Sequence, residues 1–180
     1  INTTLTPVSV SYLITSTANG CSNTETITVA INPMPTLTSG LTVNALCNVS
    51  PLFYIASSGT PGTTFAWSRA AVAGISNAAA TGAGNIIETL NNTSANPITV
   101  NYVYTSTANG CSNPQTVSVV INPTPTLSST QTAAPVCNNT LFNYAATSAT
   151  SGTTFAWSRA AVTGISNAAT TGTGANISET

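Results

Sequence analysis

The charged residues of this chain are its main candidates for ion-pair or acid–base chemistry. It has two basic residues, Arg69 and Arg159, and three acidic ones, Glu25, Glu88 and Glu179, and it contains no Asp, Lys or His. Arg69 and Glu88 recur together about 90 positions later as Arg159 and Glu179. Such a recurring pair predicts either a ligand-binding site or a structural ion pair between two strands. Because charges are so rare here, we favour the structural role.

The missing residue types exclude most catalytic chemistry. A serine triad needs a His and an acid. Glycoside hydrolysis needs two carboxylates beside one bond, and Gln115 stands where Glu25 would recur. Calcium sites use mainly carboxylates, structural zinc sites use closely spaced Cys and His, and an intramolecular isopeptide bond needs Lys. We therefore expect no enzyme, no cofactor and no metal site.

Four cysteines are the remaining reactive side chains. Cys47 lies near the start of one 90-residue period and Cys111 near its end. We expect these two to form a disulfide, which would stabilise the fold by about 4 kcal/mol in the chain-entropy model. Cys21 and Cys137 would then pair with cysteines outside the chain. The alternative pairs Cys21 with Cys47 and Cys111 with Cys137, which would join neighbouring repeats.

Internal repetition sets the organisation of the chain. The ten residues Thr63–Val72 return unchanged at Thr153–Val162, and many other positions match at the same offset. The stretches "INPMPT" and "INPTPT" carry two closely spaced prolines, which break a strand and stiffen a short linker. We therefore predict a slice of a longer tandem array. Residues 1–34 end one repeat, 35–124 form a complete repeat, and 125–180 begin the next.

Alternating residues predict short strands within the complete repeat. The runs Pro97–Thr107 and Pro114–Asn122 alternate apolar and polar residues on either side of Asn109-Gly110, a strong signal for a two-residue hairpin turn. Further strands are expected at Leu52–Ala56, Thr63–Arg69 and Ile86–Leu90, with an edge strand within Leu37–Ala45 and an irregular loop over Ala71–Gly84. Six or seven short strands in about 90 residues favour an all-β sandwich with immunoglobulin-like topology.

Trp67 and Trp157 occupy matching places in the predicted middle strand. The interpretation we favour is that Trp67 is the core tryptophan of the sandwich. The alternative is a platform on which a sugar ring stacks.

The overall composition limits the possible partners. Only 3% of residues are charged, whereas 42% are hydrophobic. The composition argues against nucleic acids as partners, because their binding depends on basic residues that neutralise phosphates. No apolar stretch is long enough for a membrane-spanning helix. Weak electrostatic repulsion is compatible with lateral packing of identical arrays into a fibre.

Several motifs together resemble a known family. The stretches "VCNNTLFNYAATS", "TTFAWSRA", "NYVYTSTANGCSN" and "VSVVINPTP" are similar to the PKD-like, immunoglobulin-like repeats of very large surface proteins of gliding and biofilm-forming Bacteroidota. The positions that carry the resemblance are Cys47, Trp67, Tyr102, Gly110, Cys111 and Pro123. The family often has Gly two residues beyond the first Cys, where this chain has Val49 and Asn139. The resemblance implies export and display as an adhesin or filament.

Two functions follow as hypotheses. The first is a structural repeat of a secreted cell-surface adhesin or extracellular filament, which contacts neighbouring identical repeats and serves attachment and cohesion. The second is an array of carbohydrate-binding modules in a surface or secreted protein that acts on polysaccharide. An exposed Trp67 would favour the second, and a packed Trp67 the first.

Overall fold

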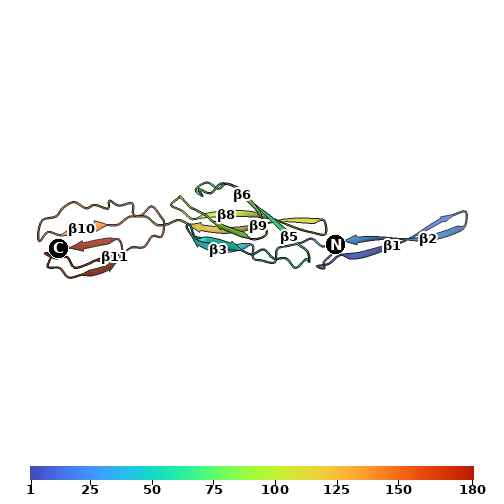
Figure 1. Cartoon of the computed structure of the whole chain (residues 1–180), viewed down its shortest axis with the longest axis horizontal. Helices are drawn as coiled ribbons and strands as arrows, with labels where there is room; N and C mark the ends of the chain where they lie inside the picture. Colours follow the sequence, from blue (N-terminus) through green and yellow to red (C-terminus); the bar gives the residue numbers. More distant parts are fainter.

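The chain is all-β and extended. The computed structural model describes residues 1–180 and contains thirteen strands and no helix. Three parts follow one another along the long axis: a two-stranded hairpin, a central sandwich and a smaller pair of two-stranded sheets (Figure 1). No helix of a length and hydrophobicity suited to crossing a membrane is present.

Two sheets form the central sandwich. The larger sheet has the order β3-β9-β8-β5-β6, and the smaller one consists of β4 and β7. Their bounds are β3 Thr42–Cys47, β4 Pro51–Tyr54, β5 Thr64–Arg69, β6 Ala80–Ala83, β7 Ile86–Thr89, β8 Ile98–Ala108 and β9 Cys111–Asn122. All neighbours are antiparallel except β3 and β9, which are parallel. This arrangement is that of an immunoglobulin-like β-sandwich.

The long hairpin of β8 and β9 is the centre of the larger sheet. Ala108 pairs with Cys111 across the turn, and the two turn residues, Asn109 and Gly110, have φ values of 50° and 76°. Asn and Gly are the residues that tolerate this left-handed backbone, which matches the twist of the strands. The hairpin of β1 (Val8–Ala18) and β2 (Cys21–Ile31) has the same register and an Asn-Gly turn of the same kind.

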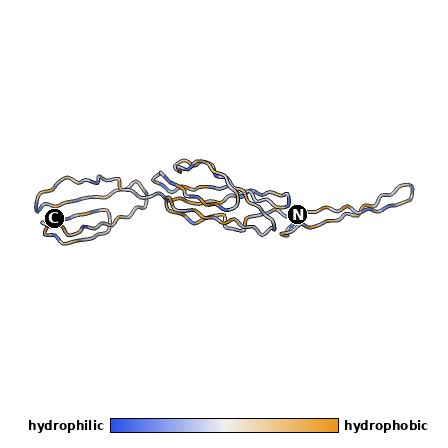
Figure 2. Tube along the Cα trace, in the orientation of Figure 1, coloured by the Kyte–Doolittle hydropathy of each residue, from blue (hydrophilic) through white to orange (hydrophobic).

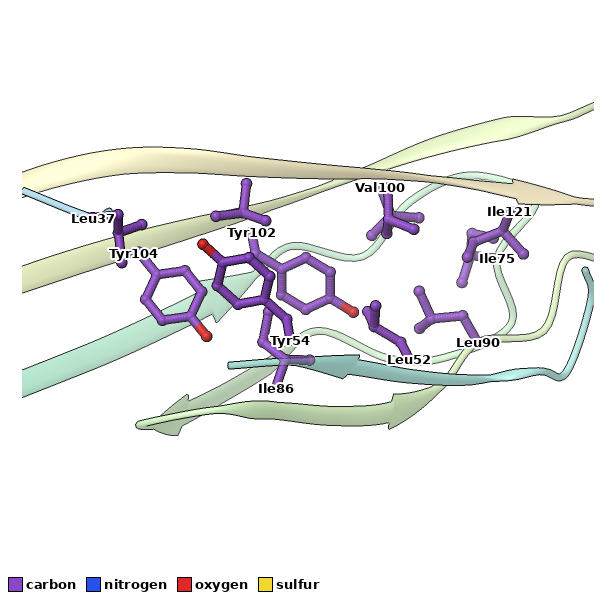
Figure 3. Close-up of a cluster of buried hydrophobic side chains, with 12 residues drawn as sticks. Leu37, Leu52, Tyr54, Ile75, Ile86, Leu90, Val100, Tyr102, Tyr104 and Ile121 are labelled. Atoms are coloured by element: carbon purple, nitrogen blue, oxygen red, sulfur yellow. The ribbon is translucent and has the colours of Figure 1, made fainter. Parts of the chain in front are cut away.

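Alternation along β8 and β9 builds the core. Val100, Tyr102 and Tyr104 are fully buried, because every second side chain of β8 faces the opposite sheet. The other core residues come from both sheets and their loops: Leu37, Leu52, Tyr54, Ile75, Ile86, Leu90, Val117, Val119 and Ile121. Figure 3 shows these side chains pointing into the space between the sheets.

The last part of the chain repeats half of the sandwich. β10 (Phe142–Ala145) pairs with β13 (Asn176–Glu179), and β11 (Ala156–Arg159) pairs with β12 (Thr170–Thr173). These pairs correspond to β4 with β7 and β5 with β6. Hydrophobic residues also run along β1 and β2 (Figure 2), where Tyr12 is 57% exposed although its counterpart Tyr102 is fully buried.

Two expectations about the strands were wrong, and the expected edge strand is present as β3 with shifted bounds. β6 lies inside the stretch Ala71–Gly84, which we expected to be an irregular loop, because its backbone pairs with β5 despite its weak strand propensity. The second hairpin strand begins at Cys111 rather than Pro114. The edge strand begins at Thr42, whereas Leu37 makes only an isolated bridge with Ser58.

Candidate functional site

Arg69 and Glu88 form an ion pair that connects the two sheets. Arg69 lies on β5 of the larger sheet and Glu88 on β7 of the smaller one. Arg69 Nε donates to Glu88 Oε2 at 3.0 Å and Nη2 to Oε1 at 3.2 Å, so the pair is bidentate. The side chains are 1% and 16% exposed. We call these residues, together with Tyr102, the Arg–Glu–Tyr cluster.

The remaining bonding capacity of the cluster is used by neighbouring groups. Tyr102 Oη donates to Glu88 Oε2 at 2.5 Å, and Arg69 Nη2 also donates to the carbonyl oxygen of Ala78 at 2.7 Å. The polar groups of Arg69, Glu88 and Tyr102 therefore find their hydrogen-bond partners within the cluster and in the neighbouring backbone. Such a closed arrangement fits a clasp between sheets better than a ligand site.

The protonation states in the cluster are held by these contacts. Burial raises the pKa of Glu88, but the hydrogen bonds from Arg69 and Tyr102 outweigh it, so the pKa is lowered overall. Burial and the hydrogen bond to Glu88 raise the pKa of the Tyr102 phenol far above its ordinary value. The hydrogen bond to Glu88 raises the pKa of Arg69. These shifts move each pKa further from pH 7. General acid–base catalysis at pH 7 works best with a group whose pKa is near 7, so these three groups are unsuited to it.

The second Arg–Glu pair repeats the main contacts of the first. Arg159 Nε lies 2.9 Å from Glu179 Oε2, and Arg159 Nη2 donates to the carbonyl oxygen of Ala168 at 2.7 Å. These side chains are 28% and 24% exposed, so water reaches this pair more easily.

Trp67 packs within the sandwich rather than standing free. Its ring meets Tyr102 edge-on, with centroids 5.7 Å apart and planes at 73°. A Cβ on Gly82 would lie 2.5 Å from Trp67 Cζ2, so the indole occupies the space beside that glycine. The indole nitrogen is buried without a hydrogen-bond partner. This packing supports the structural role of Trp67, and Trp157 lies in the same way against Gly172.

The linker Asn32–Leu37 is bound to the β8–β9 hairpin that follows it in the chain. Asn32 Nδ2 donates to the carbonyl oxygen of Asn109 at 2.7 Å, at the hairpin turn. Asn113 Nδ2 donates to the carbonyl oxygen of Pro35 at 3.0 Å. The amide of Leu37 donates to Gln115 Oε1 at 2.7 Å. We call these three bonds the linker–hairpin contact.

Packing reinforces the linker–hairpin contact. Pro33 and Pro35 are fully buried. Close by, a Cβ on Gly59 would lie 3.2 Å from Leu5 Cδ1, so the loop that precedes β1 touches the loop between β4 and β5. The sequence indicated a stiff proline linker, but not that side chains of the next hairpin bind it. Asn113 and Gln115 carried no recognisable signal, because Asn and Gln are common in exposed strands and turns.

The disulfide expected between Cys47 and Cys111 is wrong. The parallel pairing of β3 with β9 places Cys47 opposite Asn122, at the end of β9, whereas Cys111 begins that strand. A strand of this length separates them by more than about 30 Å, and a disulfide needs Cα atoms within about 7 Å. All four cysteines are free.

The alternative cysteine pairing is also wrong. Cys21 lies at the tip of the β1–β2 hairpin, and the other end of that hairpin leads to Asn32, which contacts Asn109. Cys47 lies one further strand length away, beside Asn122. Cys21 and Cys47 are thus separated by two consecutive strand lengths. The repeat places Cys111 and Cys137 at the same separation.

Outside the two Asn-Gly hairpin turns, two further non-glycine residues adopt a backbone conformation that normally favours glycine. Val49 and Asn139 have φ values of 52° and 59°, and they occupy the position where the resembled family often has Gly. In the first copy the turn is closed by the amide of Ser50, which donates to the carbonyl oxygen of Cys47 at 3.1 Å. A left-handed β-branched residue is a strained feature.

Comparison with known proteins agrees with this fold. The family model described as PKD-like domain matches residues 44–125, which span most of the central sandwich. No curated protein matches the chain. The match supports a PKD-like, immunoglobulin-like domain of the kind that is typically structural and non-catalytic, and it indicates no enzymatic family. Such domains are common in extracellular and surface proteins.

Proposed function

We propose that the chain is a structural segment of a secreted cell-surface adhesin or extracellular filament. In this proposal, tandem repeats form a stalk or fibre that serves attachment and cohesion. The observation that carries it is the linker–hairpin contact, because a linker bound by three hydrogen bonds and two buried prolines holds successive repeats in one direction. A flexible linker would instead let the repeats collapse on one another.

The repeated architecture supports the same function. The β1–β2 hairpin matches β8–β9 in register and turn, and the two strand pairs of segment 125–180 match β4 with β7 and β5 with β6. In an array, each hairpin would both complete its own sandwich and bind the linker that enters it. Every unit would then present the same faces to its neighbours along the fibre, and the low charge would permit lateral contacts between fibres.

The test is the shape of a longer array in solution. We would fuse two copies of the 180-residue sequence head to tail, with one leucine at the junction in the place of the buried Leu90, and measure the maximum dimension by small-angle X-ray scattering. The proposal expects this dimension to roughly double relative to the single chain. A fusion whose maximum dimension grows much less than its mass would contradict a stiff stalk.

Matched variants would locate the source of stiffness. Asn113→Ala together with Gln115→Ala removes two of the three bonds of the linker–hairpin contact, and the scattering should then show a broader range of shapes. Asn101→Ala on the same hairpin is the control, because its side chain bonds only to Ser118 on the exposed face. Equal stiffness in both variants would mean that the linker–hairpin contact does not set the direction of the repeats.

A further inference from the structure

We propose that Cys47 forms a disulfide with the hairpin cysteine of the following repeat, the counterpart of Cys111. This inference rests on the proposed tandem array. The cross-link would join each repeat to the next one beside the linker. It differs from both pairings that the sequence suggested.

The first step is the position of Cys47 at the exit of its repeat. Cys47 lies opposite Asn122, the last residue of β9. The next residue, Asn48, donates its Nδ2 to Thr124 Oγ1 at 3.2 Å, within the following linker. The thiol is exposed. Cys47 therefore lies at the end of the sandwich from which the chain leaves toward the next repeat.

The second step is the position of the hairpin cysteine at the entrance of its repeat. Asn32 is the counterpart of Asn122, and its Nδ2 donates to the carbonyl oxygen of Asn109 at 2.7 Å. Asn109 is followed in the same turn by Gly110 and Cys111. A cysteine placed beside Asn32, as Cys47 is placed beside Asn122, would lie next to the turn that carries Cys111.

The third step is that the two junctions of this chain are alike. At the first junction, Leu5 lies against Gly59. Their counterparts, Ala95 and Ala149, line one shared cleft at the second junction, and Asn48 lines it too. The residue after Cys47 is thus part of the surface that meets the next repeat.

The chemistry needs an oxidant outside the cell. Cys47 and the hairpin cysteine together lose two protons and two electrons as the sulfur–sulfur bond forms. A protein disulfide of an exported thiol oxidase would accept both electrons. One thiolate attacks that disulfide to give a mixed disulfide, and the second thiolate then displaces the oxidase, which leaves as a dithiol. Disulfides of this kind persist in oxidising extracellular settings.

The test uses the head-to-tail fusion with one leucine added at the junction. The addition is needed because Asn2 is the counterpart of Asn92. Asn2 Nδ2 donates to the carbonyl oxygens of Thr6 and Ile31. Asn92 Nδ2 donates in the same way to those of Asn96 and Ile121. Ile1 therefore matches Asn91, and no residue would match the buried Leu90. The fusion would be exported to the bacterial periplasm, its free thiols alkylated, and its unreduced peptides analysed by mass spectrometry.

The expected result is two cross-links. Cys47 of the first copy should be joined to Cys21 of the second, and Cys137 of the first copy to Cys111 of the second. The other four cysteines should be alkylated. The single chain, treated in the same way, should keep all four thiols. Cys21→Ser in the second copy should remove the link to Cys47, whereas Cys21→Ser in the first copy should leave both links intact.

Other outcomes would overturn the inference. Links of Cys47 to Cys111 or of Cys137 to Cys21 would show pairing within a repeat. Free thiols in a fusion that scattering shows to be extended would reject the cross-link and leave the stalk standing. A fusion that is folded by circular dichroism but collapsed in scattering, with free thiols, would reject the stalk and the cross-link together.

Discussion

Neutralising Glu88 should strongly destabilise the central sandwich. Glu88→Gln keeps the size of the side chain but removes its charge, which leaves the Arg69 guanidinium, 1% exposed, without a counter-ion. Breaking a buried ion pair by removing one partner costs about 3–5 kcal/mol. The exposed Glu25→Gln should change the free energy of unfolding by less than about 0.5 kcal/mol.

The size of the effect follows from the bonds that Glu88 accepts. Two come from Arg69, at 3.0 and 3.2 Å, and one from Tyr102 at 2.5 Å. Each hydrogen bond to a charged group contributes about 1.5–3 kcal/mol. A glutamine can replace part of this bonding, which places the net loss near 3–5 kcal/mol. Replacing Arg69 as well, by Met, should restore part of the stability because no unpaired charge then remains.

Urea unfolding followed by tryptophan fluorescence would measure this loss. In a Trp157→Phe background only Trp67 emits, and its ring contacts the cluster through Tyr102. The midpoint should shift with an unchanged slope. A loss below about 1 kcal/mol for Glu88→Gln, or a double variant no more stable than Glu88→Gln alone, would refute the idea that the pair is a buried clasp.

The same pair predicts the acid sensitivity of the sandwich. The pKa of Glu88 is lower in the folded state than its ordinary value of 4.5. The stabilisation is therefore complete above about pH 4.5, and it is lost as pH falls through the lower folded-state value. Glu88→Gln should flatten the dependence of unfolding free energy on pH in this acidic range. An equal acid dependence in both proteins would contradict this assignment.

Three further changes can be measured in the same urea assay. Gly82→Ala should lower the free energy of unfolding by about 1–3 kcal/mol, because the new Cβ would lie 2.5 Å from Trp67. Gly40→Ala is the near-neutral control, because the nearest atom to its new Cβ would be 3.7 Å away. Val49→Gly should raise the free energy of unfolding by up to about 1 kcal/mol, because it removes the strain of a left-handed backbone and loses little packing from a side chain that is 58% exposed. Val49→Ala should not raise it, and a rise equal to that of Val49→Gly would reject strain as the cause. Asn92→Ala should lower the free energy of unfolding by about 2–4 kcal/mol, because the buried Asn92 side chain donates to the carbonyl oxygens of Asn96 and Ile121 and accepts from the amide of Ser94. A decrease as small as that caused by Asn101→Ala would contradict this role.

Local patterns predicted the elements that depend on local physics. Alternation and the Asn109-Gly110 turn indicated the β8–β9 hairpin, because a strand faces the core with every second residue and a tight hairpin needs positive φ. The recurrence of Arg69 with Glu88 indicated a pair, since an unpaired buried charge is costly. Tyr102 completes this cluster from β8, and nothing in its own pattern distinguishes it from Tyr104.

Non-local pairing explains the errors. The parallel alignment of β3 with β9 joins segments about 75 positions apart, and strand patterns do not encode which strands become neighbours. The disulfide prediction depended on this unknown alignment, because Cys47 and Cys111 are near each other only if β3 runs the other way. β6 was missed since Ala80–Ala83 consists of small and polar residues whose strand conformation comes from its partner β5.

The parallel alignment of β3 and β9 has a mechanical consequence. β3 is the first strand of the sandwich and β9 the last, and they run side by side in the same direction. Tension applied through the two linkers therefore pulls β3 and β9 past each other along their length. Under such shear, the hydrogen bonds between them bear the load together, whereas strands pulled apart from one end would open bond by bond. A unit of this kind should unfold only at high force, as the proposed stalk would require under load.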